Sequence, residues 1–444
     1  MSKQLFGTDG IRGVAGEFPL DARTAHAFGA ALGAWAAKHP SPEVLIGMDT
    51  RESGRWLAEQ VAGGLGRCGV QVRFAGLLTT PGVAYLTRTG PFVAGVMISA
   101  SHNPYQDNGI KVFDHSGYKL PDEEEGRMER DIFALLETGI DERRAELAVD
   151  GSLVAAYIDY LTSSFPSAMD GLKMVVDCAH GASAHIAPEL FRRLGGDVMA
   201  HGCAPDGRNI NLNCGALHVD GLREIVQRER AGVGIAYDGD ADRAILVAAS
   251  GKIIDGDSIL LLCGRALKAD GRLANDTVVA TVMSNLGLER ALASSGIRML
   301  RTPVGDKYVL EEMLRTGSAL GGEQSGHVIF REYATTGDGL LTSLCVLEVM
   351  RRSGLDLDAL TEDLEIYPQR LVNVRVRQRR PLAELAAVGD EIRAAEEAFG
   401  PAGRVLVRFS GTEPLARVMV EGPDLASVEN WANRIADVIR AELA

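Results

Sequence analysis

Short apolar runs alternate with longer amphipathic runs along most of the chain. The apolar runs predict buried strands at 44–48, 70–74, 93–98, 174–177, 232–237 and 278–283. The longer runs predict helices at 20–38, 123–146, 153–164 and 340–352. Strands that alternate with helices in this way are typical of an α/β fold, for which we expect mainly parallel sheets.

The C-terminal part has a different pattern. Residues 372–377 alternate with a period of two, which predicts an antiparallel strand with one solvated face. Helices are predicted near 381–399 and 426–443, on either side of two further strands. Since 444 residues are too many for one core, the length predicts roughly three or four domains, and the order of the elements divides the chain into four. Three α/β domains are placed at 1–150, 151–252 and 253–366, and a smaller α+β domain at 367–444.

Composition and charge exclude several classes of protein. The chain is 46% apolar and 24% charged, as in ordinary globular proteins, and has no apolar run long enough for a membrane span. Its start has no apolar signal core, so we expect a cytoplasmic protein that does not bind membranes. The net charge of −14 argues against nucleic-acid binding. Six scattered cysteines without a CxxC pair argue against disulfides and structural zinc.

The residues that follow strand 93–98 are the first candidates for chemistry. Ser101 stands at the exit of this strand, where its hydroxyl can stand clear of the backbone, and Lys111 is close in sequence. An ordinary polar loop is one interpretation, and a nucleophile or phosphate carrier is the other. His102 is a tempting base, but neighbouring side chains on an extended loop point apart.

A run of alternating carboxylates follows strand 232–237. Asp238, Asp240 and Asp242 can direct their oxygens at one hard cation, whereas without a cation their crowding is repulsive. A calcium EF-hand is excluded because Arg243 and Ala249 stand where Gly and Glu are required. The trio leaves room for a phosphate oxygen, as magnesium sites do, and a solvated acidic turn is the alternative.

Three further segments suit a phosphorylated sugar. Glu323, Ser325 and His327 alternate, so an extended segment would project all three to one side, although a polar edge strand is an equal alternative. Arg408 and Arg417 flank a turn of Ser and Thr hydroxyls that can enclose a phosphate, and a plain hairpin turn is the alternative. Near the N-terminus, a glycine-rich loop carries Arg12 and allows close approach of a ligand. Because the chain has neither a Walker lysine loop nor a GxSxG elbow, nucleotide-driven kinases and α/β-hydrolases are disfavoured.

Four runs resemble, in order, the motifs of the α-D-phosphohexomutase family. They are Ser-Ala-Ser-His-Asn-Pro at 99–104, Asp-Gly-Asp-Ala-Asp-Arg at 238–243, Gly-Glu-Gln-Ser-Gly-His at 322–327 and Arg-Phe-Ser-Gly-Thr-Glu-Pro at 408–414. The resemblance covers essentially the whole chain. It implies a heart-shaped molecule with three similar mixed α/β sandwich domains and a C-terminal domain similar to the TATA-binding-protein fold.

The resemblance also implies a role for each motif residue. Ser101 would be the phosphoserine and would bind one Mg²⁺ with Asp238, Asp240 and Asp242. The residues around the reacting phosphate would be Arg12, Lys111, Arg243 and His327, without a ranking as general acid or base. Those that hold the sugar would be Thr302, Gly305, Asp306, Glu323 and Ser325. Those that hold the other phosphate would be Arg408, Ser410, Gly411, Thr412 and Arg417.

The implied reaction moves a phosphate between two positions of one hexose. Within the family, the runs 6–13 and 205–211, Cys214-Gly215 and Gln324 favour glucosamine phosphate as the substrate. Glucosamine 6-phosphate and glucosamine 1-phosphate would interconvert through a 1,6-bisphosphate, supplying cell-wall precursor synthesis. Glucosamine or glucose 1,6-bisphosphate would be the activating phosphate donor, and a homodimer is suggested. The alternatives are a mutase for mannose or glucose phosphate, a non-catalytic sugar-phosphate binding protein and a magnesium-dependent phosphatase.

Overall fold

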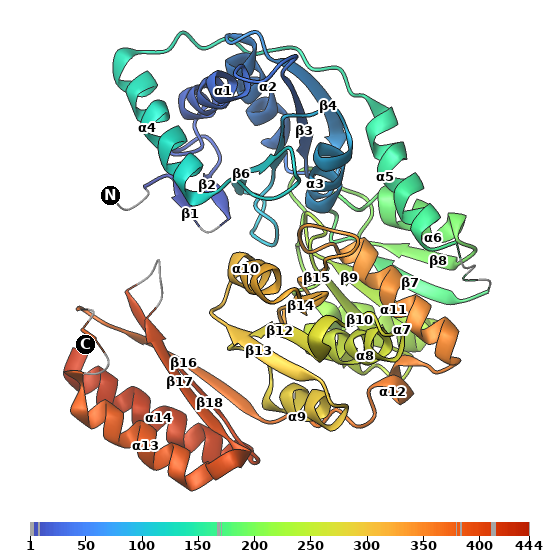
Figure 1. Cartoon of the computed structure of the whole chain (residues 1–444), viewed down its shortest axis with the longest axis vertical. Helices are drawn as coiled ribbons and strands as arrows, with labels where there is room; N and C mark the ends of the chain where they lie inside the picture. The colour runs from blue at the N-terminus through green and yellow to red at the C-terminus, as the bar shows by residue number, and fades with distance from the viewer. Residues whose placement is uncertain are drawn as a thin grey trace. The chain divides into compact units, whose positions relative to one another are not determined.

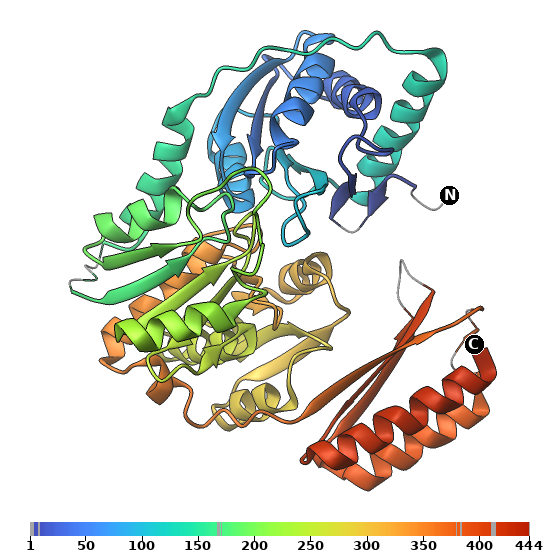
Figure 2. The same ribbon diagram turned by 180° about the vertical axis from the view of Figure 1, so that it is seen from behind.

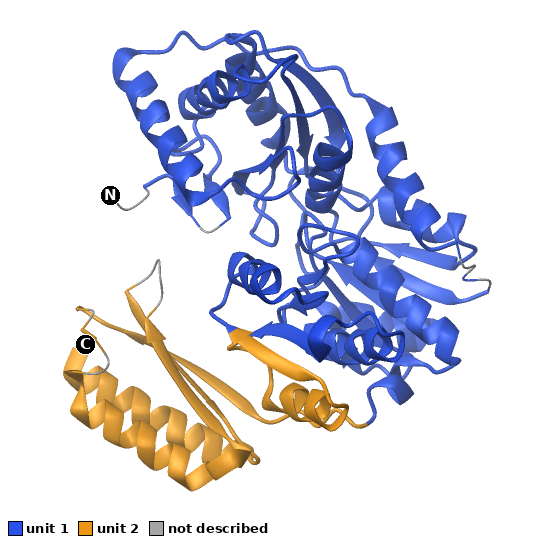
Figure 3. Ribbon diagram, in the orientation of Figure 1, with its two compact units in different colours: residues 1–281, 302–362 blue, residues 282–301, 363–444 orange. Residues whose placement is uncertain are grey.

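The computed structural model describes residues 4–7, 9–166, 169, 171–378, 380–381, 384–409 and 414–443 (Figure 1). The chain divides into two compact units, which Figure 3 colours separately. The first unit comprises residues 1–281 and 302–362, and the second comprises residues 282–301 and 363–444. Among the described residues, no helix has the combination of length and apolar content that a membrane crossing requires.

The first sheet of unit 1 has six strands. In spatial order they are β1 (Phe6–Gly7), β2 (Gly10–Val14), β6 (Asp107–Asp114), β5 (Ala94–Ile98), β3 (Glu43–Met48) and β4 (Gln71–Leu77). The helices of this region are α1 (Ala22–Ala36), α2 (Gly54–Gly66), α3 (Thr80–Thr89) and α4 (Asp122–Thr138). Strand β3 pairs in parallel with β4 and β5, whereas β5 and β6 form an antiparallel hairpin. Side chains of β3, β5, α1 and α2 form one continuous hydrophobic core.

The second sheet of unit 1 has five strands. Their order is β11 (Ile253–Ile254), β10 (Ala244–Ala248), β9 (Val233–Tyr237), β7 (Lys173–Asp177) and β8 (Asp197–His201). The helices that accompany them are α5 (Gly151–Ser164), α6 (Ile186–Arg193) and α7 (Val219–Glu229). Strand β7 pairs in parallel with β8 and β9, and β9 continues into β10 as an antiparallel hairpin.

The third region of unit 1 repeats this arrangement. Strand β12 (Thr277–Thr281) pairs in parallel with β14 (Leu320–Gly322), which forms a hairpin with β15 (Val328–Phe330). The helices here are α8 (Gly256–Ala269), α10 (Asp306–Thr316), α11 (Gly339–Ser353) and α12 (Leu357–Leu360), with a 3₁₀ turn, η1 (Ala274–Asp276). The α/β class is therefore confirmed.

Each sheet of unit 1 places a motif in a hairpin between a parallel strand and an antiparallel one. The loops are 99–106 between β5 and β6, 238–243 between β9 and β10, and 323–327 between β14 and β15. The sheets are thus mixed, and the expectation of mainly parallel sheets is wrong. Fully buried strands such as β10 are apolar on both faces, so their pattern does not distinguish parallel from antiparallel pairing.

Unit 2 is an α+β structure. Its sheet runs in the order β16 (Gln369–Arg375), β18 (Leu415–Glu421) and β17 (Arg404–Phe409), all antiparallel. Helices α13 (Ala386–Phe399) and α14 (Leu425–Leu443) lie side by side against the sheet (Figure 2), and 3₁₀ turn η3 (Gly400–Ala402) follows α13. Helix α9 (Leu286–Ser294) and most of β13 (Arg298–Thr302) also belong to this unit.

Two differences from the predicted elements have local causes. The charged helix expected over 123–146 ends at Thr138, because Gly139 adopts a φ of 81° that a helix cannot continue. Helix α1 begins at Ala22 because the Asp21 side chain caps it by accepting a hydrogen bond from the amide of Thr24. The limits given above for the four domains remain predictions, because the two compact units divide the chain at other positions.

Candidate active site

Ser101 occupies a strained position three residues after the end of β5. Its φ is 54°, in the left-handed region that non-glycine residues rarely adopt. Its amide donates a hydrogen bond to Ser99 Oγ over 2.9 Å, and Ser99 Oγ donates in turn to Asp49 Oδ2 over 2.6 Å. Its own hydroxyl donates to Asp238 Oδ2 over 2.5 Å. The fold therefore turns the Ser101 hydroxyl towards the acidic loop.

The side chains of Arg51, which is buried, and Asn211, which is partly buried, hold the Ser101 loop. Arg51 Nη2 donates to the carbonyl oxygens of Ser101 and Asn103 over 2.9 and 2.8 Å. Its Nε pairs with Asp49 Oδ2 over 2.9 Å, and both side chains are fully buried. Asn211 Nδ2 donates to the Ser101 carbonyl over 2.9 Å. Sequence reasoning missed Arg51 and Asn211 as supports, because nothing in the sequence relates them to a loop 50 or 110 residues away.

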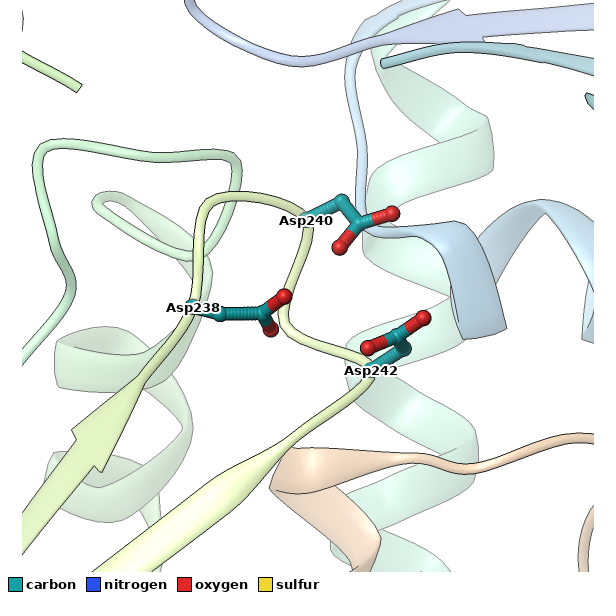
Figure 4. A group of neighbouring side chains, drawn as sticks. All are labelled: Asp238, Asp240 and Asp242. Carbon is teal, nitrogen blue, oxygen red and sulfur yellow. The ribbon is translucent and has the colours of Figure 1, made fainter. Parts of the chain in front are cut away.

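The three aspartates of the β9–β10 loop converge, as Figure 4 shows. All three are buried, and one carboxylate oxygen from each lies within 4.8 Å of one from each of the others. Burial and the charges of Asp242 and Asp240 raise the pKa of Asp238 well above its usual range. Gly239 separates the first two aspartates at a point where any Cβ would collide with the Ser101 carbonyl. The motif therefore needs glycine there for close approach.

This arrangement fits a hard divalent cation. Asp240 Oδ1 and Asp242 Oδ1 are buried and have no hydrogen-bond partner among the described residues. Asp240 Oδ2 is held by Thr80 Oγ1 over 2.5 Å and by Lys111 Nζ over 2.9 Å. Oriented carboxylates with free, buried oxygens are the ligands that Mg²⁺ prefers. We conclude that the acidic loop has the donor set of a metal site.

Cations surround the acidic loop on the N-terminal side. Lys111 Nζ lies 2.9 Å from both Asp240 Oδ2 and Asp9 Oδ2. Burial alone would lower the pKa of Lys111, but Asp240 and Asp9 raise it above its usual range, so the ammonium is charged at neutral pH. Arg12 pairs with Asp9, and its buried Nε has no hydrogen-bond partner among the described residues. The residues expected around the reacting phosphate are thus brought together here.

Arg243 and His102 complete this cluster. The Arg243 amide donates to Asp238 Oδ1 over 3.2 Å, while its Nε, 3.8 Å from Asp242 Oδ1, has no hydrogen-bond partner in the described part of the chain. His102 Nδ1 lies 3.3 Å from Ser101 Oγ, so the expectation that these neighbours point apart is wrong. The positive φ of Ser101 is the reason, since the loop is not extended there. Burial and the nearby Arg243 lower the pKa of His102 to about 4, which keeps it neutral.

Residues 323–327 form the tight turn of the β14–β15 hairpin, so the extended segment assumed for them is wrong. The Glu323 amide donates to the carbonyl of His327 over 2.9 Å, and Gly326 turns the chain with a φ of 89°. Glu323 Oε1 accepts a hydrogen bond from the amide of Gly305 over 2.9 Å. Ser325 Oγ is buried without a hydrogen-bond partner among the described residues. Glu323 is therefore tied to the loop before α10, and Ser325 is available to a ligand.

His327 joins this turn to the acidic loop. Its Nδ1 lies 3.5 Å from Asp242 Oδ1, and its Nε2 accepts a hydrogen bond from the Gly337 amide over 3.1 Å. Burial lowers the pKa of His327, but Asp242 and Asp306 outweigh burial and raise it to about 9. The Gly337 contact requires an unprotonated Nε2. A cation held by Asp242 would cancel the charge that raises the pKa, so we assign the neutral ring with its proton on Nδ1.

The loop 302–306 leads into α10. Gly305 precedes the helix with a φ of 133°, and Asp306 is the first helical residue. Asp306 Oδ2 lies 2.5 Å from Lys119 Nζ, which is also 2.5 Å from Asp9 Oδ1. Thr302 Oγ1 donates to the carbonyl of Pro303 over 3.0 Å. Sequence reasoning did not predict Asp9 or Lys119 as site residues. The glycines around Asp9 indicated a loop that a ligand can approach, whereas nothing in the sequence marked Lys119.

In unit 2, Arg408 and Arg417 lie opposite each other on β17 and β18. Burial and the charge of Arg417 lower the pKa of Arg408. Like charges at directly opposite strand positions favour an anion between them. The turn residues Ser410, Gly411 and Thr412 lie outside the described residues.

Comparison with known proteins places the chain in a family. Models of the phosphoglucomutase/phosphomannomutase α/β/α domains I, II and III match residues 3–138, 155–251 and 255–367, and the C-terminal domain model matches residues 371–438. A phosphoglucomutase/phosphomannomutase family protein of Burkholderia thailandensis has the same fold, with a TM-score of 0.81, 24% identity and coverage of 99% and 98% of the two chains. An N-acetylphosphoglucosamine mutase of Aspergillus fumigatus, solved with GlcNAc-6P and magnesium, has a TM-score of 0.68 at 19% identity over 99% and 96%.

The chain therefore belongs to the phosphoglucomutase/phosphomannomutase family, the α-D-phosphohexomutases, and is an enzyme of the phosphomutase class. This confirms the family resemblance and the four-domain α/β architecture. Among its relatives, the phosphoglucosamine mutase of Solibacter usitatus is 64% identical over the full length of both chains. The phosphoglucosamine mutase of Koribacter versatilis is 51% identical over 99% of this chain and 97% of its own.

Proposed function

We propose that this phosphomutase interconverts glucosamine 6-phosphate and glucosamine 1-phosphate through a phosphorylated Ser101. The full-length relatives named phosphoglucosamine mutase support the substrate. One observation carries the mechanism: the Ser101 hydroxyl donates to Asp238 Oδ2 over 2.5 Å at the edge of the converged acidic loop. A serine so placed can carry a phosphate whose oxygen completes a cation site.

The proposed reaction consists of two phosphoryl transfers. In the first, the bond between phosphorus and Ser101 Oγ breaks and a bond between phosphorus and O1 of glucosamine 6-phosphate forms. The O1 proton passes to a protein base, and Ser101 Oγ takes up a proton. The 1,6-bisphosphate then turns within the site. In the second transfer the bond between phosphorus and O6 breaks, the phosphoryl group passes to Ser101 Oγ, which loses its proton, and O6 gains a proton. Phosphate and protons balance, so neither nucleotide nor water is consumed.

The acidic loop and the cations around it would stabilise the phosphoryl group during its transfer. We propose that Asp238, Asp240 and Asp242 hold one Mg²⁺ with a phosphoserine oxygen, and that when bound the ion neutralises phosphoryl charge. Arg12, Lys111 and Arg243 add fixed positive charge, which offsets the repulsion between a phosphate and a chain of net charge −14. The buried Nε atoms of Arg12 and Arg243, which have no hydrogen-bond partner among the residues that the structure describes, suit phosphate oxygens.

Acid–base roles follow from protonation. The Asp240 and Asp9 carboxylates hold the pKa of Lys111 above its usual range, so Lys111 suits the supply of fixed positive charge to the phosphoryl group. His102 is neutral and lies 3.3 Å from Ser101 Oγ, which makes it a candidate to exchange the serine proton. We propose His327 as a positioning partner of Asp242, because its Nε2 already accepts the Gly337 amide.

The remaining motifs would recognise the sugar and its second phosphate. We propose that Glu323 and Ser325 bind sugar hydroxyls or the amine, and that the loop with Thr302, Gly305 and Asp306 selects the orientation. Arg408, Ser410, Gly411, Thr412 and Arg417 would bind the phosphate that is not reacting. We further propose a cytoplasmic enzyme, activation by glucosamine or glucose 1,6-bisphosphate, and a homodimer.

Turnover of three substrates tests this proposal. In coupled assays of the magnesium-loaded enzyme, glucosamine phosphate should have a higher kcat/KM than glucose or mannose phosphate. Equal or better turnover of mannose or glucose 1-phosphate would contradict the substrate. Net release of inorganic phosphate in place of isomerisation would contradict the reaction.

A further inference from the structure

The residues around the acidic loop form a ring in which carboxylates and lysines alternate from Asp240 to Asp306, and the neutral His327 closes the ring. Each of the successive pairs Asp240–Lys111, Lys111–Asp9, Asp9–Lys119 and Lys119–Asp306 has a nitrogen–oxygen distance of at most 2.9 Å. His327 lies between the last carboxylate and the acidic loop: its Nε2 is 4.0 Å from Asp306 and its Nδ1 is 3.5 Å from Asp242. Asp242 and Asp240 belong to the same acidic loop, which completes the ring. The ring draws residues from the segments matched as domains I, II and III.

The two lysines of the ring have different surroundings. The Lys111 side chain is 1% exposed, whereas those of Lys119, Asp9 and Asp306 are 23%, 21% and 20% exposed. Lys111 therefore lies on the inside of the ring, at the acidic loop. Lys119 lies on its water-facing side, where domain I meets the loop before α10.

The backbone of Lys119 is held firmly. A tight turn after β6 is closed by hydrogen bonds from the Asp114 amide to the Tyr118 carbonyl over 2.8 Å and from the Gly117 amide to the Asp114 carbonyl over 2.9 Å. Lys119 forms an isolated antiparallel β-bridge with Phe113. The Gly117 carbonyl accepts a hydrogen bond from Thr335 Oγ1 of domain III over 2.6 Å. The ammonium is thus presented from a rigid turn.

Lys119 converts a repulsive contact into an attractive one. Asp9 Oδ1 and Asp306 Oδ2 each lie 2.5 Å from the same nitrogen, so these two oxygens are at most about 5 Å apart. Without the ammonium, two carboxylates from different domains would face each other across this short distance. The contact between domain I and the 302–306 loop would then be disfavoured instead of favoured.

We infer that Lys119 is a positioning residue that holds the 302–306 loop of domain III against domain I. By holding this loop, Lys119 keeps the bisphosphate intermediate on the enzyme while the intermediate turns. This inference rests on the proposed function. Retention matters because an intermediate that leaves takes both phosphates with it and leaves Ser101 unphosphorylated. The enzyme is then inactive until a bisphosphate from solution restores the phosphoserine.

The chain offers a matched control. Lys307 also pairs across to domain I, with Asp122, but it is outside the ring. Lys119→Met and Lys307→Met therefore remove the same charge and one ion pair between the same domains. Lys119→Arg keeps a cation between the two carboxylates and is the conservative variant.

The experiment starts from enzyme phosphorylated at Ser101, loaded with magnesium and supplied with glucosamine 6-phosphate. The measured quantity is the amount of 1,6-bisphosphate found free in solution per isomerisation, with and without added glucose 1,6-bisphosphate. Lys119→Met should raise this released fraction about tenfold, with activity that decays unless the bisphosphate is added. Lys307→Met should match the wild type, and Lys119→Arg should lie close to it.

Two results would overturn the inference. One is that Lys119→Met releases no more bisphosphate per isomerisation than the wild type. The other is that Lys307→Met raises the released fraction as much as Lys119→Met does. Thermal unfolding is recorded for each variant. If Lys119→Met does not fold, Lys119→Gln, which keeps a donor without the charge, is measured against the same outcomes. Failure of the proposed function looks different, since the wild type itself would then carry no phosphoserine and form no bisphosphate.

Discussion

Ser101 Oγ and Asp238 Oδ2 are 2.5 Å apart although 137 residues separate them in the chain. Ser101 lies in the loop after β5 of the first sheet and Asp238 lies in the loop after β9 of the second, so the packing of the two sheets creates the contact. The proposed carrier hydroxyl and the proposed cation-binding loop are thereby both buried and in contact.

Removal of the carrier hydroxyl is the first test. Ser101→Ala should lower kcat by at least about 10⁴-fold, because no other group can hold the phosphate between the two transfers. Isomerisation in a coupled assay is the measurement, and Ser163→Ala, at an exposed helix position, should keep full activity. A Ser101→Ala enzyme with wild-type turnover would refute the carrier role.

The acidic loop should depend on magnesium for stability as well as activity. Because the three carboxylates repel one another, magnesium at about 100 times its Kd should raise the free energy of unfolding by about 2.7 kcal/mol. Chelation should abolish isomerisation, and added magnesium should restore it. Asp240→Asn should reduce the magnesium-induced rise in melting temperature. An equal rise in the wild type and the variant would argue against a site at this loop.

The buried Arg51–Asp49 pair should be costly to break. Both side chains are fully buried, so Arg51→Met leaves Asp49 without its counter-ion and should destabilise the protein by about 3–5 kcal/mol. It should also lower kcat, because Arg51 holds the carbonyls of the Ser101 loop. Thermal unfolding and turnover are the measurements. Arg127→Met, which breaks exposed pairs on α4, should cost less than about 1 kcal/mol; a similar cost for both would contradict the argument.

Asp338 gives a pH dependence with a defined sign. It caps α11 in a buried position, and burial raises its pKa to about 6. The folded protein holds this proton more tightly than the unfolded chain, so its contribution to stability is present below pH ~4 and falls by about 3 kcal/mol as the pH rises through ~6.

Asp338→Asn removes this titration. The melting temperature of Asp338→Asn minus that of the wild type should therefore increase as the pH rises from about 4.5 to 7. Thermal unfolding at both values is the measurement, with the exposed cap variant Asp356→Asn as the control. A difference from wild type that does not change with pH would show that Asp338 does not titrate in this range.

The fold class and the loops that carry chemistry were predictable from sequence. Polar and glycine-rich runs that directly follow apolar strands have to lie at strand ends, and this placed Ser101 and the three aspartates correctly at strand exits. The antiparallel partner strands were not predictable, because a fully buried strand has the same apolar pattern in either direction.

The supporting residues were not predictable for a different reason. Arg51, Asn211 and Lys119 act across 50 to 187 residues of sequence, and their partners are set by packing between elements. The proximity of His102 to Ser101 was missed because it depends on a positive φ that no residue type requires there. Local pattern thus locates a motif, whereas geometry between motifs requires the folded chain.

The central claim is that Ser101 carries the phosphate that moves. The most direct measurement is the intact mass of enzyme incubated with glucose 1,6-bisphosphate and magnesium, followed by peptide mapping and a chase with glucosamine 6-phosphate. With an isotopic label on the phosphates of the bisphosphate, the account predicts one labelled phosphoryl group on Ser101, which is absent in Ser101→Ala. During the chase the label should pass to the sugar while unlabelled phosphate from the sugar replaces it on Ser101. Active enzyme that never carries phosphate on Ser101, or label that stays there through turnover, would contradict the account.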